Sequence, residues 1–338
     1  MEPKLNNWPS YSEDEWWRQW ATQSAGELSL LANWQHDWRQ WQELLRAKVC
    51  ELLDWEQQDD EVPVQLLGQK DAQGFSVQKI AFAADDGTQV AGYVCVPHAN
   101  ETPLPAVVIS ADAGVWKEAI VGLLDEGNPD AAPGSRLAAR GYVVCCIDRR
   151  GCGERPRRDD SQGMWEWLGK PAVGRDAADL VRAYRVLCQR PDVRPDRIGI
   201  IGVGRGAASA LYAAIVESSL YAVALCGYLT RYRALPLAPS DRERRALWEL
   251  VSGTVPAGLP AHADLEDLAC LIAPRPLCLF QQHEASSWQY PATEAARRIA
   301  DGFSLMGEKV KLTVEIGQGP ADYPGETVLR FLDDWLKL

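Results

Sequence analysis

A glycine-rich turn between an apolar strand and a helix is the part of this sequence that points most directly to chemistry. The segment reads Ile200-Ile201-Gly202-Val203-Gly204-Arg205-Gly206-Ala207-Ala208. A sharp turn of this kind exposes its central side chain at the amino terminus of the following helix, a position that suits a serine nucleophile. The central residue here is Gly204, which has no side chain to react. Any chemistry must therefore come from other residues.

Histidine placement argues against an ordinary serine-hydrolase triad. A serine nucleophile needs a base within hydrogen-bond reach, oriented by a third group. The motifs G-x-S-x-G and G-x-C-x-G occur nowhere in the chain, and the histidines are His36, His98, His262 and His283. In hydrolases built on such a turn the order is nucleophile, acid, histidine. Because no histidine follows His283, we expect no ordinary triad.

The same turn also fits a dinucleotide-binding fingerprint. Gly202, Gly204 and Ala207 match G-x-G-x-x-A after a strand. That fingerprint belongs to the first strand of its unit and expects an acidic residue about twenty residues further on, at the end of the next strand. Several strands precede the turn here, and the next strand ends at 225–227 in Leu-Cys-Gly. Nucleotide binding through this turn stays as a second alternative function.

Alternating strands and helices must position the turn. A hairpin at residues 85–88 joins the first two predicted strands, which span 75–84 and 89–96. Further strands are predicted at 105–110, 142–148, 197–202, 221–227, 276–281 and 309–316, and helices at 135–140, 176–189, 205–217, 293–306 and 326–338. Continuous apolar strands alternating with helices predict an α/β fold, a mostly parallel central sheet with helices on both faces. Residues 228–270 are expected to form an irregular insertion in a domain spanning 75–338.

Residues 1–60 form a separate zone, a predicted Trp-rich helical amino-terminal extension. Eight of the fourteen tryptophans lie there. Trp34, Trp38, Trp41 and Leu45 repeat at helical spacing and would line one face of an amphipathic helix. An aromatic lid over a ligand is one interpretation. Packing against the main domain or a second subunit is the interpretation we favour, because aromatic stripes at helical spacing usually supply buried area.

Composition limits the class of protein. The chain has 338 residues, 46% hydrophobic, and a net charge of −12, which disfavours nucleic acid and anionic membrane surfaces as partners. It shows no secretory signal and no apolar run long enough to span a bilayer. Nine cysteines without C-x-x-C spacing indicate buried thiols in a reducing cytoplasm, with no metal and no cofactor. The arginines between 149 and 158, interspersed with acidic residues, predict a solvated loop with local ion pairs.

Three segments resemble the acetyl xylan esterase and dienelactone hydrolase branch of the α/β-hydrolase superfamily. Residues 146–154 (CIDRRGCGE) resemble the D-x-R-G-x-G-E turn of that group, residues 195–199 its P-D-R-I-G motif, and residues 271–277 its I-A-P-R-P-L motif. The resemblance spans residues 75–338 and implies the α/β-hydrolase fold. It also implies esterase chemistry, provided that the catalytic residues are present.

Carried over position by position, the resemblance places all three triad roles on small residues. The nucleophile maps to Gly204, the acid to Ala285 and the histidine to Ala321. The loop that supplies the oxyanion side runs from Ser110 to Glu118; it keeps the terminal Lys-Glu and has lost most of its glycines. Trp116 in that loop is large enough to fill the pocket. We therefore expect a pseudoenzyme with a binding or regulatory role.

Two further hypotheses keep a site at these loops. His283, Glu284 and Asp322 lie on the loops that would carry the acid and the histidine, so a histidine beside a carboxylate could activate water in an unconventional ester hydrolase. The helix amino terminus at Gly204, followed by Arg205, could hold a small anionic ligand. The candidate ligand-binding residues are Asp112, Gly204, Arg205, His283, Glu284 and Asp322. A protein partner and a homo-oligomer are the other expected associations.

Overall fold

The computed structural model describes residues 12–23, 25–34, 36–57, 61–98, 103–124, 132–156, 161–283, 288–319 and 323–338. Within them the strands are β1 (Val64–Ala72), β2 (Phe75–Ala83), β3 (Gln89–Pro97), β4 (Leu104–Ser110), β5 (Val143–Ile147), β6 (Val193–Val203), β7 (Ala222–Cys226), β8 (Leu277–His283) and β9 (Leu312–Gln318). The longer helices are α1 (Glu13–Gln23), α3 (Trp38–Leu53), α7 (Ala172–Cys188), α8 (Arg205–Val216), α9 (Asp241–Val251), α12 (Tyr290–Leu305) and α13 (Glu326–Leu336). Shorter helices are α2 (Leu30–Asn33), α4 (Lys117–Ile120), α5 (Pro133–Ala139), α6 (Ser161–Trp167), α10 (Leu259–His262) and α11 (Leu265–Cys270), with 3-10 turns η2 (Tyr232–Leu237) and η3 (Lys309–Lys311).

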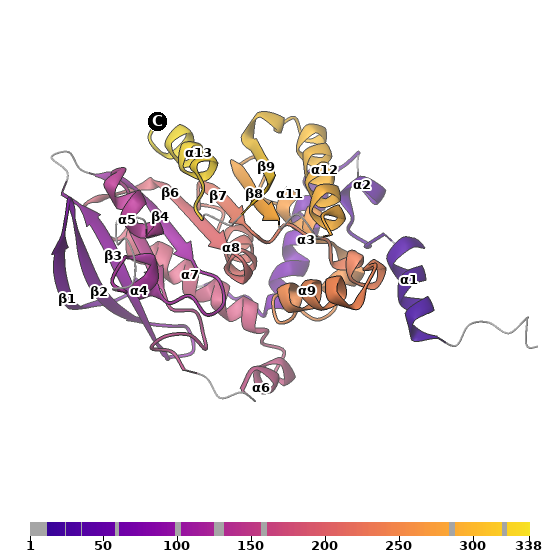
Figure 1. The fold of residues 1–338 in the computed structure, drawn as a ribbon, viewed down its shortest axis with the longest axis horizontal. Coiled ribbons are helices and arrows are strands. Elements are labelled where there is room, and N and C mark those ends of the chain that lie inside the picture. The colour runs from indigo at the N-terminus through magenta and orange to yellow at the C-terminus, as the bar shows by residue number, and fades with distance from the viewer. Residues whose placement is uncertain are drawn as a thin grey trace, which may run out of the picture.

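The described strands form one nine-stranded sheet in the order β1-β2-β3-β5-β4-β6-β7-β8-β9. The first three strands and the β3–β5 pair are antiparallel, and all later pairs are parallel. Figure 1 shows the antiparallel strands at one end of the molecule and α1 at the other. The sequence-based prediction of a mostly parallel α/β sheet is confirmed. The sheet begins at Val64, however, and not at residue 75 as predicted.

Helices cover both faces of the sheet. On one face α3, α7, α8, α11 and α12 pack on the larger apolar cluster; on the other, α4, α5 and α13 pack on a second cluster. The central strand β6 is buried from Ile198 to Gly202, as expected of a parallel strand covered on both sides. Because the carboxyl ends of parallel strands meet at one edge, the loops after β4, β6, β7, β8 and β9 gather there.

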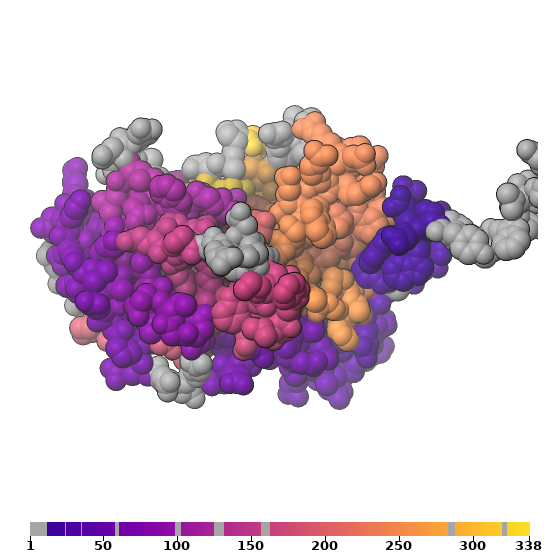
Figure 2. Space-filling model, turned by 90° about the horizontal axis from the view of Figure 1, so that it is seen from below, coloured from indigo at the N-terminus to yellow at the C-terminus, as the bar shows by residue number. Residues whose placement is uncertain are grey.

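The amino-terminal segment packs onto this body through α3. Trp41 and Leu45 are fully buried, and Trp34 and Trp38 pack partly buried against the same cluster. The Trp41 indole N–H donates to the Leu28 carbonyl at 2.6 Å. For this stripe, therefore, the structure shows packing and not a ligand platform. Figure 2 shows α1, by contrast, as a projecting indigo patch beside the orange part of the chain.

The segment 228–270, expected to be irregular, contains η2, α9, α10 and α11. The prediction of an irregular segment was wrong on this point. Helix α9 buries only Val251, so charged residues dominate its sequence and no apolar stripe marks it as a helix. No described helix is both long and apolar enough to cross a lipid bilayer.

Candidate functional site

The turn singled out by the sequence lies at the carboxyl end of β6. Gly204 adopts φ 52° and ψ −126° and forms the N-cap of α8. Its amide donates to the Cys226 carbonyl at 2.8 Å, which ties the turn to β7. Gly202 is required for close packing, because a Cβ there would lie 2.3 Å from the Ala207 Cα. The turn thus has the sharp strand-to-helix geometry that displays a nucleophile in this type of fold.

The side chain of Asp112, in the loop after β4, occupies the position that a nucleophile would need. A Cβ built on Gly204 would lie 2.1 Å from the Asp112 Cγ, so no larger residue fits at 204 while Asp112 stays in place. Asp112 Oδ1 accepts hydrogen bonds from the Arg205 amide at 2.9 Å and from the Ala113 amide at 2.7 Å. We call this arrangement the Asp112 plug.

The two amides that donate to Asp112 lie at the positions where an α/β-hydrolase has its oxyanion hole. In α/β-hydrolases the oxyanion hole is made by the amide of the residue after the nucleophile and an amide from the loop after an earlier strand. Arg205 follows Gly204, and Ala113 lies in the loop after β4. Both matching donors are therefore bonded to a carboxylate of the chain itself. Trp116, expected to fill the pocket, is instead 50% exposed.

The guanidinium of Arg205 turns away from the plug. Its Nη2 donates to the Ser252 carbonyl at 2.6 Å and its Nη1 to the Glu249 carbonyl at 3.2 Å. These carbonyls lie at the end of α9, where a cation is favoured by the helix dipole. Arg205 therefore joins the start of α8 to the end of α9, and its side chain does not face the position that Asp112 occupies.

Tyr323 is a site residue that the sequence analysis missed. A Cβ on Gly227 would lie 2.8 Å from its hydroxyl, which places the phenol beside the end of β7. Its ring packs edge-on against Phe280 at 5.6 Å. Burial, with contributions from Cys226 and Asp112, raises the pKa of Tyr323 to about 12. Its position just after the mapped histidine loop was a usable signal.

Several predicted site residues cannot be placed. Ala285 and Ala321, the mapped acid and histidine positions, lie outside the described residues, as do Glu284 and Asp322. His283 is the last residue of β8, and its side chain is likewise outside the described part. Of the candidates, the structure brings together Asp112, Gly204 and the backbone of Arg205.

The retained Lys-Glu pair of the loop after β4 belongs to an ion cluster centred on the buried Lys117 and Asp148. Lys117 Nζ lies 2.5 Å from Asp148, 2.8 Å from Glu118 and 2.9 Å from Glu154. Burial alone would lower the pKa of Lys117, but the hydrogen bonds that its ammonium donates to these carboxylates raise it above its ordinary value. Asp148 and Glu154 belong to the D-x-R-G-x-G-E segment, so the motif residues hold two loops together.

A polar cavity of about 640 Å³ lies beside the plug, lined in part by Gly114, Trp116, Arg149 and Arg205. The arginines near it are neither solvated nor paired locally, contrary to our expectation. Arg149 pairs with Asp176 at 3.0 Å, while Arg150 and Arg155 pair with Asp179 at 2.8 and 2.7 Å. Both aspartates are on α7, so these pairs fasten the turn to the core.

The described residues offer neither a set of metal ligands nor a reactive thiol. No group of three or more His, Cys, Asp or Glu side chains there is placed to hold a metal ion. All nine cysteines are free, and six of them are buried. The turn at Gly204, which we call the elbow, donates its amide to the carbonyl of Cys226. Burial raises the pKa of the Cys226 thiol, and a buried thiol with a raised pKa is a poor nucleophile.

Comparison with known proteins agrees with this geometry. The model of the Abhydrolase family matches residues 29–300. A Bacillus subtilis (strain 168) protein named "Putative hydrolase YtaP" is 30% identical over 244 residues, covering 68% of this chain and 73% of its own. A "putative acetyl xylan esterase" from Bacteroides fragilis NCTC 9343 superposes with a TM-score of 0.75 at 15% identity, over 92% of this chain and 83% of its own. A glucuronoyl esterase from Solibacter usitatus gives a TM-score of 0.67 at 15% identity, covering 96% of this chain and 97% of its own. The likeness to these two structures shows a shared fold, and the family match shows that the chain belongs to the Abhydrolase family.

Proposed function

We propose that this protein does not hydrolyse esters by a serine mechanism and that it serves instead in binding or regulation. The Asp112 plug carries the proposal. Asp112 Oδ1 takes both amides that would stabilise a tetrahedral oxyanion, and its Cγ lies where the Cβ of a nucleophile would stand. The donors of an oxyanion hole are worth about 2.7–4 kcal/mol each in the transition state. A resident carboxylate removes that contribution and repels developing negative charge.

The alternative of an ester hydrolase using His283, Glu284 and Asp322 meets the same obstacle. Water activated by a histidine still produces a tetrahedral oxyanion, and that oxyanion still needs donors. With Asp112 in place, the amides of Ala113 and Arg205 are not available to it. This alternative would require Asp112 to leave the elbow during turnover.

Nucleotide or anion binding at the elbow is disfavoured on similar grounds. A pyrophosphate at Gly202, Gly204 and Ala207 would need the amides at the amino terminus of α8, and Asp112 holds the first of these. A free small anion would compete with a carboxylate tethered in place, whose effective concentration is high. The expected small anionic ligand, protein partner and second copy of the chain remain predictions. The cytoplasmic location is also a proposal, supported by nine free thiols.

The test is an esterase assay with nitrophenyl acetate and butyrate, paired with labelling by a fluorophosphonate probe. We expect no turnover above that of a heat-denatured sample and no labelled serine, with an authentic serine esterase as the positive control. Turnover together with one labelled serine would refute the proposal.

Two histidine variants test the alternative of an ester hydrolase that activates water through His283. Turnover that disappears in His283→Ala but persists in His98→Ala would favour the water-activating hydrolase. His98 is a suitable control because it is about half exposed and its ring lies 3.8 Å from Asp71 of β1, on the antiparallel hairpin and remote from the elbow. Loss of turnover in both variants would point to a general structural effect.

A further inference from the structure

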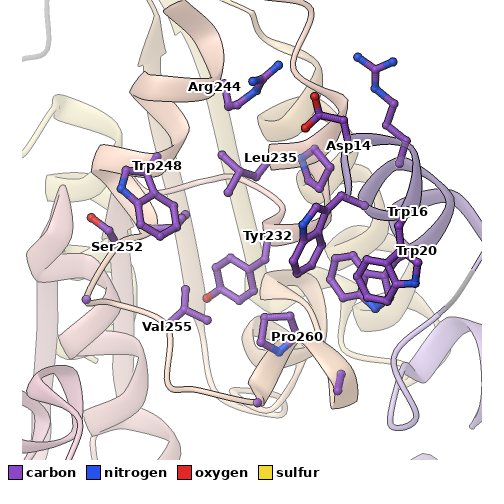
Figure 3. A pocket seen from close by; sticks show the side chains of 17 residues that line it. Asp14, Trp16, Trp20, Tyr232, Leu235, Arg244, Trp248, Ser252, Val255 and Pro260 are labelled. Carbon is purple, nitrogen blue, oxygen red and sulfur yellow. The ribbon is translucent and has the colours of Figure 1, made fainter. Parts of the chain in front are cut away.

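A large, mostly apolar cavity lies between α1 and the helical segment that follows β7. Its volume is about 640 Å³, within the range of small-molecule sites. We call it the Trp pocket and define it by Trp16, Trp17 and Trp20 of α1 with Tyr232, Trp248 and Pro260. Figure 3 shows Trp248 on one side, Trp16 and Trp20 on the other, and Tyr232 between them. The cavity does not include Gly204 or Asp112.

The aromatic rings of α1 form an edge-to-face series. The Trp16 and Trp17 ring centroids are 4.8 Å apart and those of Trp17 and Trp20 are 5.7 Å apart, with nearly perpendicular planes. The Arg233 guanidinium lies 4.3 Å from the Trp20 ring and helps to hold α1 in place. Across the cavity Trp248 is 59% exposed, and Trp16 is 57% exposed. Such large aromatic surfaces facing water across a cavity mark a binding surface.

Core packing does not explain these tryptophans. Helix α1 contains no buried residue, whereas α3 buries Trp41 completely. An 11-residue helix is marginal in water without packing, so α1 depends on its contacts with η2 and with Arg233 for its stability. A molecule filling the Trp pocket would bury its rings and stabilise α1 at the same time.

The charges at the rim indicate the class of ligand. The charged lining residues are Asp14 and Arg18 on α1 and Arg244 on α9, which carry opposite signs. The interior is formed by aromatic and aliphatic side chains such as Leu235 and Val255. A ligand with a strong net charge would gain little from a rim of mixed sign. An uncharged ring system would gain from the apolar area and from the aromatic faces.

We propose that the Trp pocket binds an uncharged, flat aromatic small molecule. The inference rests on the proposed binding role and gives it a place away from the elbow. The pocket is nevertheless connected to the plug: Ser252 lines it, and its carbonyl accepts from Arg205, whose amide donates to Asp112.

The test uses N-phenyl-1-naphthylamine, an uncharged aromatic probe that accepts tryptophan emission, on the full chain. We expect saturable binding at one site. Trp248→Ala and Trp16→Ala should each weaken it at least about fivefold, the effect of losing one aromatic contact. Trp167→Ala is the matched control, because Trp167 is 86% exposed on α6 and does not line the pocket; its affinity should stay within about twofold of wild type.

A second readout does not depend on a variant. Arg18 lies in exposed α1, so the probe should slow tryptic cleavage after Arg18 several-fold while cleavage in other exposed segments continues at its usual rate. Unchanged affinity in both pocket variants, or no protection at Arg18, would overturn the proposal.

Two further outcomes are decisive. If light scattering shows a dimer that Trp248→Ala converts to a monomer, a second copy of the chain covers the pocket and the small-molecule proposal is wrong. Probe binding accompanied by serine-dependent ester turnover would overturn the proposed function and leave the pocket standing. If there is neither ester turnover nor probe binding, the small-molecule proposal is wrong and the proposed function still stands.

Discussion

A single methyl group at Gly204 tests the Asp112 plug. In Gly204→Ala the new Cβ would lie 2.1 Å from the Asp112 Cγ and 2.3 Å from both carboxylate oxygens. Real side chains do not tolerate such distances, so Asp112 must leave the elbow. When it leaves, its hydrogen bonds to the Arg205 and Ala113 amides are lost.

The expected magnitude has two parts. Alanine at φ 52° and ψ −126°, a conformation that L residues rarely adopt, carries a backbone strain of about 1–2 kcal/mol. Each hydrogen bond to the half-exposed carboxylate contributes about 1.5 kcal/mol, the lower end for charged groups, so expulsion of Asp112 costs about 3 kcal/mol. Gly204→Ala should therefore lower the free energy of unfolding by about 4–5 kcal/mol and Asp112→Ala by about 3 kcal/mol. The double variant should be no less stable than Gly204→Ala, because the expulsion is counted once.

The assay is urea denaturation followed by tryptophan fluorescence and far-ultraviolet circular dichroism. Gly141→Ala is the matched control, because Gly141 also has positive φ, at 89°, and a Cβ there would meet nothing within 4 Å. It measures backbone strain alone. The reasoning is refuted if Gly204→Ala is no more destabilising than Gly141→Ala, or if the double variant loses the sum of the two single effects.

Three other predictions follow from buried groups. Lys117→Met leaves its buried partner Asp148 uncompensated and should lower the free energy of unfolding by about 3–5 kcal/mol. The control Lys170→Met removes an exposed pair with Asp54 and should cost less than about 1 kcal/mol in the same denaturation assay. Equal losses in the two variants would contradict this account. Burial raises the pKa of Glu266 above its ordinary 4.5, although Arg231 and Arg298 pair with this carboxyl at 3.0 and 2.7 Å, so the stability that the carboxyl contributes is complete below about pH 4.5 and is lost as the pH rises through the raised pKa. Across that window the free energy of unfolding of wild type should fall relative to that of Glu266→Gln, by up to about 1.4 kcal/mol per pH unit. Denaturation at a series of pH values measures this difference, and parallel pH profiles for the two proteins would show that the group titrates normally. Trp41→Ala removes a fully buried indole and should cost about 3–5 kcal/mol, whereas Trp167→Ala should be neutral; similar melting temperatures for the two would mean that α3 is not anchored by Trp41.

The strands of the parallel sheet could be predicted from the sequence because each is a short apolar run. Residues 197–202 were predicted as a strand, and β6 covers Val193–Val203 with its apolar part buried. The edge strand β1 was missed because all of its residues are exposed, so it lacks both the alternating and the continuous apolar pattern. Helix α1 lies within the predicted helical extension of residues 1–60, but no apolar stripe marked its bounds, since none of its residues is buried.

The missing nucleophile at the elbow can be read from the order of the residues alone. Glycine at 204 and the absence of any histidine after His283 are facts of composition and order, and the α/β architecture follows from apolar periodicity. The identity of the side chain that occupies the elbow depends on how distant segments pack. Asp112 and Arg205 are 93 residues apart, and their contact exists because parallel strands β4 and β6 end side by side. The same holds for the Trp pocket, where α1 and α9 line one cavity although more than two hundred residues of chain separate them. Local patterns report which residues are buried, but which distant side chains share a cavity is fixed by how the elements pack.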